Sequence, residues 1–179
     1  WDKVLIPYWK SFAQSAKDCG VSKIALELHP GFSVYNVDTL KRLREAVGPE
    51  IGVNFDPSHL LWQGMEPVAV IRAFAGMIYH VHAKDVCIDR YNTARNGVLD
   101  TKHYSDETHR SWIFRTIGYG NDAKYWKDIF SELRKTGYDG TISIEHEDSL
   151  INRLEGLQHA VDMVKSCAIF AETSGMWWA

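Results

Sequence analysis

The sequence predicts an α/β fold built around a parallel sheet. Stretches with helical periodicity alternate with four short apolar runs that are typical of strands, namely KIALEL, IGVNFD, IYHVHAK and GTISIE. An acidic or imidazole side chain lies at or near the end of each run, at Glu27, Asp56, His82 and Glu145. The first three are spaced 56 − 27 = 29 and 82 − 56 = 26 residues apart, which suits one helical crossover between parallel strands.

Each predicted element rests on apolar periodicity and on residues that begin or end it. Asn36 or Asp38 could cap the second helix, Pro67 suits a first helical turn, and Gly20 and Gly76 suit helix ends. The predicted order is a helix over 2–18, a strand over 23–28, a helix to Val47, a strand over 51–55, a helix from Pro67, a strand over 78–84, a helix from Asn121 or Asp122 to Lys135, a strand over 141–145 and a helix over about 153–172.

The connection after the third strand is unusually long, because His82 and Glu145 are 145 − 82 = 63 residues apart. Residues 86–120 form an insertion, and loops of this length in compact domains are usually functional or disordered. We predict a polar, aromatic flap over a pocket at the strand ends, with a solvated surface loop as the alternative. Its side chains include Arg90, Arg95, Lys102, His103, His109, Arg110 and Arg115 beside Tyr91, Tyr104, Trp112 and Phe114.

Four parallel strands do not close on themselves. A (β/α)₈ barrel has eight strands in about 250 residues, whereas an open four-stranded sheet would expose its apolar inner face. We therefore predict that residues 1–179 form a single domain, the C-terminal half of a TIM (β/α)₈ barrel. The chain begins at Trp1 inside a helical pattern, which we interpret as a cut N-terminus.

The composition indicates a globular protein without a marked nucleic-acid or membrane affinity. The 179 residues are 45% hydrophobic and carry a net charge of −3, with no long charge run and no apolar run of about 20 residues. The cysteines Cys19, Cys87 and Cys167 are scattered, which favours free thiols in a reducing compartment such as the cytoplasm.

Side-chain alternation indicates which groups point toward the predicted pocket. Glu27 and His29 share one face of the first strand, where an unpaired carboxylate would cost several kcal/mol. A cation is the simplest partner for Glu27, and a salt bridge to Lys or Arg is the alternative. Asp56 is the next ligand candidate, but it begins an Asp-Pro-Ser segment, which equally suits an ordinary turn or helix cap.

The other two ligand candidates each have a competitor. His82 is nearer the strand end than His80, which favours His82 as a ligand and His80 as a packing or supporting residue. Glu145 shares a strand face with Glu147, which falls past the strand and should be more exposed. Spacing alone does not separate the two glutamates.

Five motifs follow one another along the chain, namely IALELHPGF, VNFDPSHLLWQG, HVHAKD, RSWIFRTIGYG and GYDGTISIEHEDSL. Through these motifs the chain resembles the sugar phosphate isomerase/epimerase family. These are xylose-isomerase-like TIM barrels related to ketose 3-epimerases, inosose dehydratase and endonuclease IV. The similarity covers roughly residues 1–170 and corresponds to the second half of the barrel, so the first half is missing.

The resemblance implies two sets of site residues. The divalent-metal ligands at the ends of the fifth to eighth strands would be Glu27, Asp56, His82 and Glu145. The residues that face the substrate would be His29, His59, Lys84 and Arg115.

Three carboxylates and a neutral imidazole favour Mn²⁺ or Mg²⁺, with Zn²⁺ or Co²⁺ still open. With a metal polarising a hydroxy-ketone, Glu27 and Glu145 could remove and return a proton, which predicts an isomerase or epimerase that acts on a sugar, sugar phosphate or polyol through an enediolate. The alternatives are an inosose-type polyol dehydratase, an endonuclease IV-like phosphodiesterase and an inactive half-barrel binding module. The expected partner is a small carbohydrate and not a nucleic acid or a membrane; the sugar, its phosphorylation and a homo-oligomeric state stay open.

Overall fold

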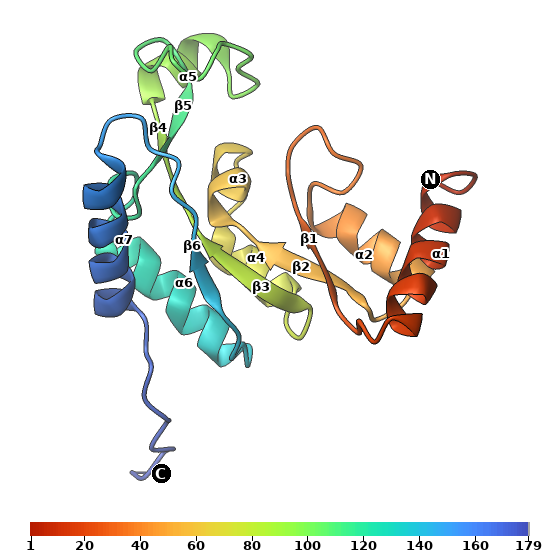
Figure 1. Cartoon of the computed structure of the whole chain (residues 1–179). Coiled ribbons are helices and arrows are strands. Elements are labelled where there is room, and N and C mark those ends of the chain that lie inside the picture. The colour runs from red at the N-terminus through yellow and green to blue at the C-terminus, as the bar shows by residue number, and fades with distance from the viewer. Residues whose placement is uncertain (179) are drawn as a thin grey trace.

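The computed structural model describes residues 1–178. No helix among them is long and apolar enough to cross a membrane. Along the chain, the elements are α1 (Leu5–Asp18), β1 (Ile24–Glu27), α2 (Val37–Val47), β2 (Ile51–Phe55), α3 (Pro57–Trp62), α4 (Pro67–Ala73), β3 (Ile78–Ala83), β4 (Asp85–Ile88), α5 (Arg90–Asn96), β5 (Trp112–Arg115), α6 (Ala123–Lys135), β6 (Ile142–Ile144) and α7 (Arg153–Cys167) (Figure 1).

The predicted parallel sheet is present, with the strand order β1-β2-β3-β6. Glu27 of β1 lies opposite Asn54 of β2, and Ala83 of β3 lies opposite Ile144 of β6. Because all four strands run in the same direction, their carboxyl ends lie at one edge of the sheet. This edge is where α/β folds place their functional groups.

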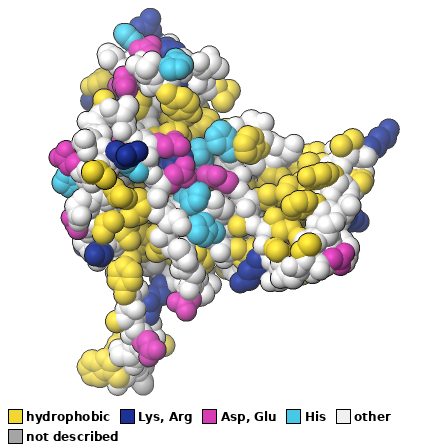
Figure 2. Space-filling model, in the orientation of Figure 1, with side chains coloured by type: hydrophobic (Ala, Val, Ile, Leu, Met, Phe, Trp, Pro, Cys, Tyr) yellow, Lys and Arg dark blue, Asp and Glu magenta, His cyan; other side chains and the backbone are white. Residues whose placement is uncertain are grey.

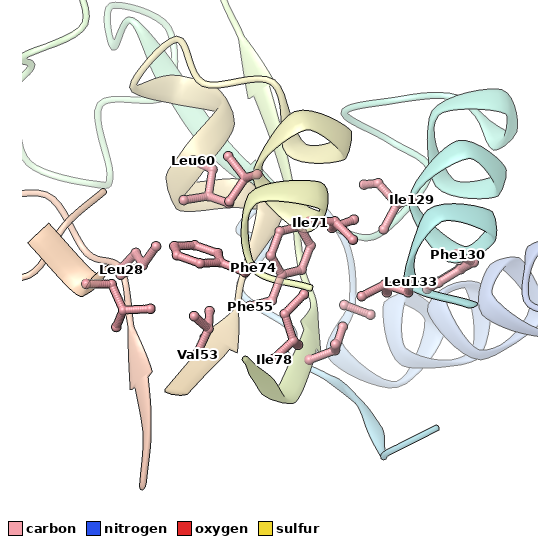
Figure 3. Close-up of a cluster of buried hydrophobic side chains, with 14 of the residues drawn as sticks. Leu28, Val53, Phe55, Leu60, Ile71, Phe74, Ile78, Ile129, Phe130 and Leu133 are labelled. Atoms are coloured by element: carbon pink, nitrogen blue, oxygen red, sulfur yellow. The ribbon is translucent and has the colours of Figure 1, made fainter. Parts of the chain in front are cut away.

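The main core lies between the sheet and the helices that cover one of its faces. Figure 3 shows side chains of β2 and β3 packed against those of α4 and α6. Phe55 and Ile71 are 0% exposed, and burying such a side chain contributes about 1.5–3 kcal/mol. The labelled members of this core are Leu28, Val53, Phe55, Leu60, Ile71, Phe74, Ile78, Ile129, Phe130 and Leu133.

The predicted helix starts are confirmed where a polar side chain caps the helix. Asn36 accepts a hydrogen bond from the backbone N–H of Thr39 and forms a capping box at the start of α2. Asp122, rather than Asn121, caps α6 by accepting from the N–H of Tyr125. Both contacts satisfy N–H groups that the helix itself leaves unpaired.

The predicted end of the last helix was wrong. The sequence predicts a helix to about Glu172, but α7 ends at Cys167 and the chain continues in an extended conformation. The guanidinium of Arg134 on α6 donates to the carbonyl of Ile169, at 3.0 Å, and to that of Ala171. These tertiary hydrogen bonds hold the carbonyls away from helical pairing.

Asp56 caps the short helix α3, so its segment is a helix cap and not a simple turn. The antiparallel part of the fold has no counterpart among the predicted elements. Residues 85–115, here called the excursion, contain the antiparallel pair β4–β5 and the helix α5. Trp112 of the excursion stacks on Trp62 of α3 at 4.5 Å with an interplanar angle of 13°, so the β4–β5 pair is packed against α3. Most residues of the segment 89–109, between the two strands, are exposed.

Candidate metal centre and adjoining cavity

Four donor side chains meet at the carboxyl ends of the parallel strands. Glu27 is the last residue of β1, Asp56 directly follows β2, His82 lies in β3, and Glu145 directly follows β6. Each offers one ligand atom, and the four atoms lie within 4.8 Å of one another. Figure 2 shows acidic and histidine side chains gathered near the centre of the face that it presents.

Several carboxylate oxygens of this cluster have no hydrogen-bond donor. Asp56 Oδ1 accepts from the Ser58 N–H at 2.8 Å and from the Ser58 hydroxyl at 2.7 Å. Three other oxygens, Glu27 Oε1, Asp56 Oδ2 and Glu145 Oε2, are buried and have no hydrogen-bond donor. His82 Nδ1 lies 2.7 Å from Glu145 Oε2 without forming a hydrogen bond.

This arrangement fits a divalent cation. A buried carboxylate oxygen without a donor is costly, and a cation bound between the oxygens removes that cost. Three carboxylates and one imidazole form an oxygen-rich donor set that suits a hard or borderline ion. The cluster could therefore bind a metal ion, held by Glu27, Asp56, His82 and Glu145.

The pKa shifts show how strongly these groups interact. Burial raises the pKa of Asp56 to about 6, although the charges of His59 and Lys84 act in the opposite direction. Interactions with the His59 and His82 side chains lower the pKa of Glu27 well below its usual range. The nearby Glu27 carboxylate raises the pKa of His82 in return. The carboxylates therefore attract positive charge to the centre.

Lys84 is a buried ammonium beside the same centre, at 3% exposure. Its Nζ donates to Glu145 Oε1 at 2.9 Å and lies 3.3 Å from Glu147 Oε2 and 3.7 Å from Asp56 Oδ2. Burial works against its charge, but the nearby Asp56 and Glu145 outweigh burial and raise the pKa of Lys84. Lys84 and a divalent ion together would balance the three carboxylates of the centre.

A cavity of about 630 Å³ adjoins the centre. Three of the residues predicted to face a substrate line it, namely His29, His59 and Lys84. The excursion contributes the apolar part of the cavity lining, through Tyr104, Ile113 and Phe114.

Arg115 is placed differently from the prediction, because it does not line this cavity. Its Nε donates to Asp148 Oδ2 at 3.1 Å, and its guanidinium lies 5.5 Å from the ring of Tyr119. Asp148 lines the cavity and also accepts from the N–H of Thr116 at 2.7 Å. Arg115 therefore supports the cavity wall through Asp148.

Glu147 and His80, the alternative ligands that the sequence left open, are not members of the cluster. Glu147 is outside the four-residue cluster, and its side chain is 51% exposed. His80 forms a hydrogen bond with the Ser143 hydroxyl at 2.9 Å, deeper in the sheet. Both locations leave Glu145 and His82 at the centre.

Sequence reasoning missed some residues of the site. Asn54 Nδ2 lies 3.3 Å from His82 Nε2, and strand alternation from Asp56 could have identified it. Nothing in the spacing singled out Asp148 or Ser149, because both follow β6 in an irregular segment.

Three relatives share much of the sequence. The protein YfiH of Bacillus subtilis (strain 168) is 46% identical over 165 residues, which are 92% of this chain and 53% of YfiH. The rhizopine catabolism protein MocC of Rhizobium meliloti is 33% identical over 135 residues, covering 75% of this chain and 39% of MocC. An inosose dehydratase of Geobacillus thermodenitrificans is 27% identical over 148 residues, covering 82% of this chain and 47% of that enzyme.

Two solved structures share the fold. The xylose isomerase domain protein from Planctomyces limnophilus has a TM-score of 0.68 and 22% identity, over 90% of this chain and 52% of that one. The probable 3-DHS dehydratase AsbF from Bacillus anthracis has a TM-score of 0.67 and 18% identity, over 89% of this chain and 55% of that one.

The chain thus spans about half the length of the proteins that it matches. Its four parallel strands correspond to half of an eight-stranded barrel. The family model described as xylose isomerase-like TIM barrel matches residues 1–167. On this match, and on the resemblance already seen in its strand-end motifs, the chain belongs to the xylose isomerase-like TIM barrel family.

Proposed function

We propose that this chain supplies the metal-binding part of the active site of an isomerase or epimerase that acts on a sugar or related polyol. The observation that supports the proposal most directly is the convergence of Glu27 and Glu145. These two carboxylates come from β1 and β6, the outermost strands of the four, yet their ligand atoms lie within 4.8 Å. A substrate held by an ion at this centre would therefore lie beside both carboxylates.

The side chains of the chain are suited to moving a proton next to a carbonyl group. A bound Mn²⁺ or Mg²⁺ would polarise a carbonyl and its neighbouring hydroxyl and so acidify the C–H between them. One of Glu27 and Glu145 would remove this proton as a carboxylate, and the other, as a carboxylic acid, would deliver its own proton to the same or the adjacent carbon. Lys84 holds the Glu145 carboxylate in place through its 2.9 Å hydrogen bond.

Dehydration of a keto-polyol is a second candidate, favoured by the relative named inosose dehydratase. It begins with the same proton removal but ends with the loss of a hydroxyl group as water. The Lys84 ammonium, 3.3 Å from Glu147 Oε2 and 2.9 Å from Glu145 Oε1, is placed to give a proton to the departing hydroxyl. Formation of an isomer or release of water distinguishes the two outcomes.

A phosphodiesterase of the endonuclease IV kind has less support. That chemistry uses several metal ions, whereas residues 1–178 contain one group of side chains with the geometry of a metal site. The net charge of −3 also offers no general attraction for nucleic acid.

Glu145→Gln tests the proposal, with Glu147→Gln as the matched control two residues away. We expect Glu145→Gln to slow deuterium uptake from D₂O into an inosose by about a hundredfold or more and to weaken Mn²⁺ binding. Glu147→Gln should keep its Mn²⁺ content, because Glu147 is outside the cluster. Uptake by Glu145→Gln at the wild-type rate would refute the assignment.

A further inference from the structure

The cavity beside the metal centre has two chemically different sides. Its polar side is formed by Glu27, Glu145, Lys84 and two histidines from the strand ends and α3. Its apolar side comes from the excursion, through Tyr104, Ile113 and Phe114. A ligand that fits both sides has hydroxyl groups on one edge and a face of C–H groups.

Tyr104 differs from Phe114, which lies on the same side, because Tyr104 is largely exposed while it lines the cavity. Tyr104 is 55% exposed, whereas Phe114 is only 7% exposed. The two rings are nearly parallel, with centroids 6.0 Å apart and an interplanar angle of 19°. The exposed part of Tyr104 is therefore available to a ligand.

The position of this ring is fixed although the residue lies between secondary-structure elements. The guanidinium of Arg110 lies 4.4 Å from the Tyr104 ring and is itself 2% exposed. Arg110 donates to the carbonyl of Trp112 at 3.1 Å and to that of Lys102. A ring held in this way loses little further freedom when it binds a ligand.

The charges around the cavity argue against an anionic ligand. Among the described residues, Lys84 is the one lysine or arginine that lines it, and its ammonium already contacts Glu145 and Glu147. Asp148, a further acidic residue of the wall, is paired with Arg115. A phosphate or carboxylate on the ligand would find no unpaired lysine or arginine among the residues of this chain that line the cavity.

From these observations we infer that the cavity selects an uncharged cyclic polyol and that Tyr104 is a specificity-determining residue on which the C–H face of the ring stacks. The inference rests on the proposed function in one respect, namely that the reacting edge of the ligand lies at the metal centre. It adds the shape and charge of the substrate, together with a residue in a part of the chain that takes no part in metal binding.

The test measures the binding of myo-inositol to the Mn²⁺-loaded protein by calorimetry. This cyclic polyol has no carbonyl group and is not turned over, so binding is read independently of activity. Tyr104→Ala should weaken binding by roughly three- to tenfold, the range expected for a lost aromatic stacking contact. Tyr104→Phe should bind like the wild type, because the ring is retained.

Tyr91→Ala is the matched control, because Tyr91 is a 70% exposed tyrosine of the same excursion outside the cavity. It should leave binding unchanged. With an inosose as substrate, Tyr104→Ala should raise KM more than it lowers kcat, and the preference for the inosose over the open-chain ketose erythrulose should fall.

Each result separates this inference from the proposed function. Equal binding of myo-inositol by Tyr104→Ala and wild type, or no saturable binding by the wild type, overturns the inference even if deuterium uptake proceeds. Tighter binding of myo-inositol 1-phosphate than of myo-inositol overturns the uncharged class. Loss of binding in Tyr104→Ala, together with no deuterium uptake by the wild-type chain either alone or in a completed barrel, supports the inference and refutes the proposed function.

Discussion

Asp56 illustrates how burial prepares a single side chain for a cation. One of its oxygens accepts two hydrogen bonds from Ser58, while the other has no donor and faces Glu27, His82 and Glu145. Burial raises the pKa of Asp56 from 3.8 to about 6 because the charged form is poorly solvated there. In the metal-free protein, this carboxylate therefore opposes folding at neutral pH.

The expected consequence is that Asp56→Asn stabilises the metal-free protein and removes the stabilisation by metal. The folded state binds the proton of Asp56 more tightly than the unfolded chain does, so the metal-free protein loses stability as the pH rises from 3.8 to about 6. At pH 7 the substitution should recover at most about 3 kcal/mol. Thermal unfolding with EDTA and with Mn²⁺ measures both effects.

Asp162→Asn, an exposed change on α7, is the control and should alter neither melting temperature. If Asp56→Asn lowered the melting temperature in EDTA, Asp56 would be structurally important rather than poised for a metal. An unchanged response to Mn²⁺ would remove Asp56 from the ligand set.

At the scale of elements, an ion pair joins two helices on the outer face of the sheet. Arg72 at the end of α4 donates from Nε to Glu132 Oε1 on α6 at 2.8 Å, and Lys135 donates to Glu132 Oε2 at 2.9 Å. The bonds with Arg72 and Lys135 lower the pKa of Glu132 to about 2. Their contribution to stability is complete above the usual pKa of 4.5 and is lost as the pH falls toward 2.

Glu132→Gln should therefore destabilise the protein at pH 7 and progressively less below pH 4.5. Urea unfolding midpoints at pH 7, at 4.5 and at the lowest pH where the protein stays folded would show the difference from wild type shrinking. Glu45→Gln, on the exposed side of α2, should show no such pH dependence. A constant difference across this range would mean that Glu132 stabilises through packing and not through its charge.

The elements that the sequence predicted correctly are those in which one local rule decides the structure. Asn36 and Asp122 cap α2 and α6, and β2 has the predicted limits Ile51–Phe55 because its apolar run is buried. The four strand-end donors could be predicted because parallel strands bring their ends together. Periodicity indicates local structure, so it could place each donor without knowing its partners.

The parts that could not be predicted depend on contacts between distant residues. The pairing of β4 with β5 brings Asp85 opposite Arg115, and no local pattern fixes that register. Tyr104 reaches the cavity because buried Arg110 holds it there. The extended segment after α7 depends on Arg134 of another helix. Such tertiary contacts override local propensity.

At the scale of the whole molecule, the sheet has two open edges within residues 1–178. β1 pairs with β2 alone, and β6 pairs with β3 alone. An open strand edge presents unpaired N–H and C=O groups that can pair with another strand. In an eight-stranded barrel these two edges would meet the remaining four strands.

We expect the part of Bacillus subtilis YfiH that lies outside the matched region to complete this barrel when it is co-expressed with the chain. YfiH is a suitable donor because it is 46% identical and the chain spans 53% of its length. The two polypeptides should co-purify in equal amounts, and the complex should bind Mn²⁺ more tightly and exchange deuterium faster than the chain alone.

Ala25→Pro provides the control for edge pairing. The N–H of Ile24 donates to the Glu50 carbonyl at 2.7 Å, so by alternation the N–H of exposed Ala25 points to the open edge of β1. Proline at position 25 removes that donor and spares the hydrogen bonds to β2, so it should abolish co-purification while the chain itself stays folded.

If the chain alone exchanged deuterium as fast as the complex, the half-barrel would carry the chemistry unaided. If the complex formed but neither bound Mn²⁺ nor exchanged deuterium, the half-barrel would be a binding module and not an enzyme.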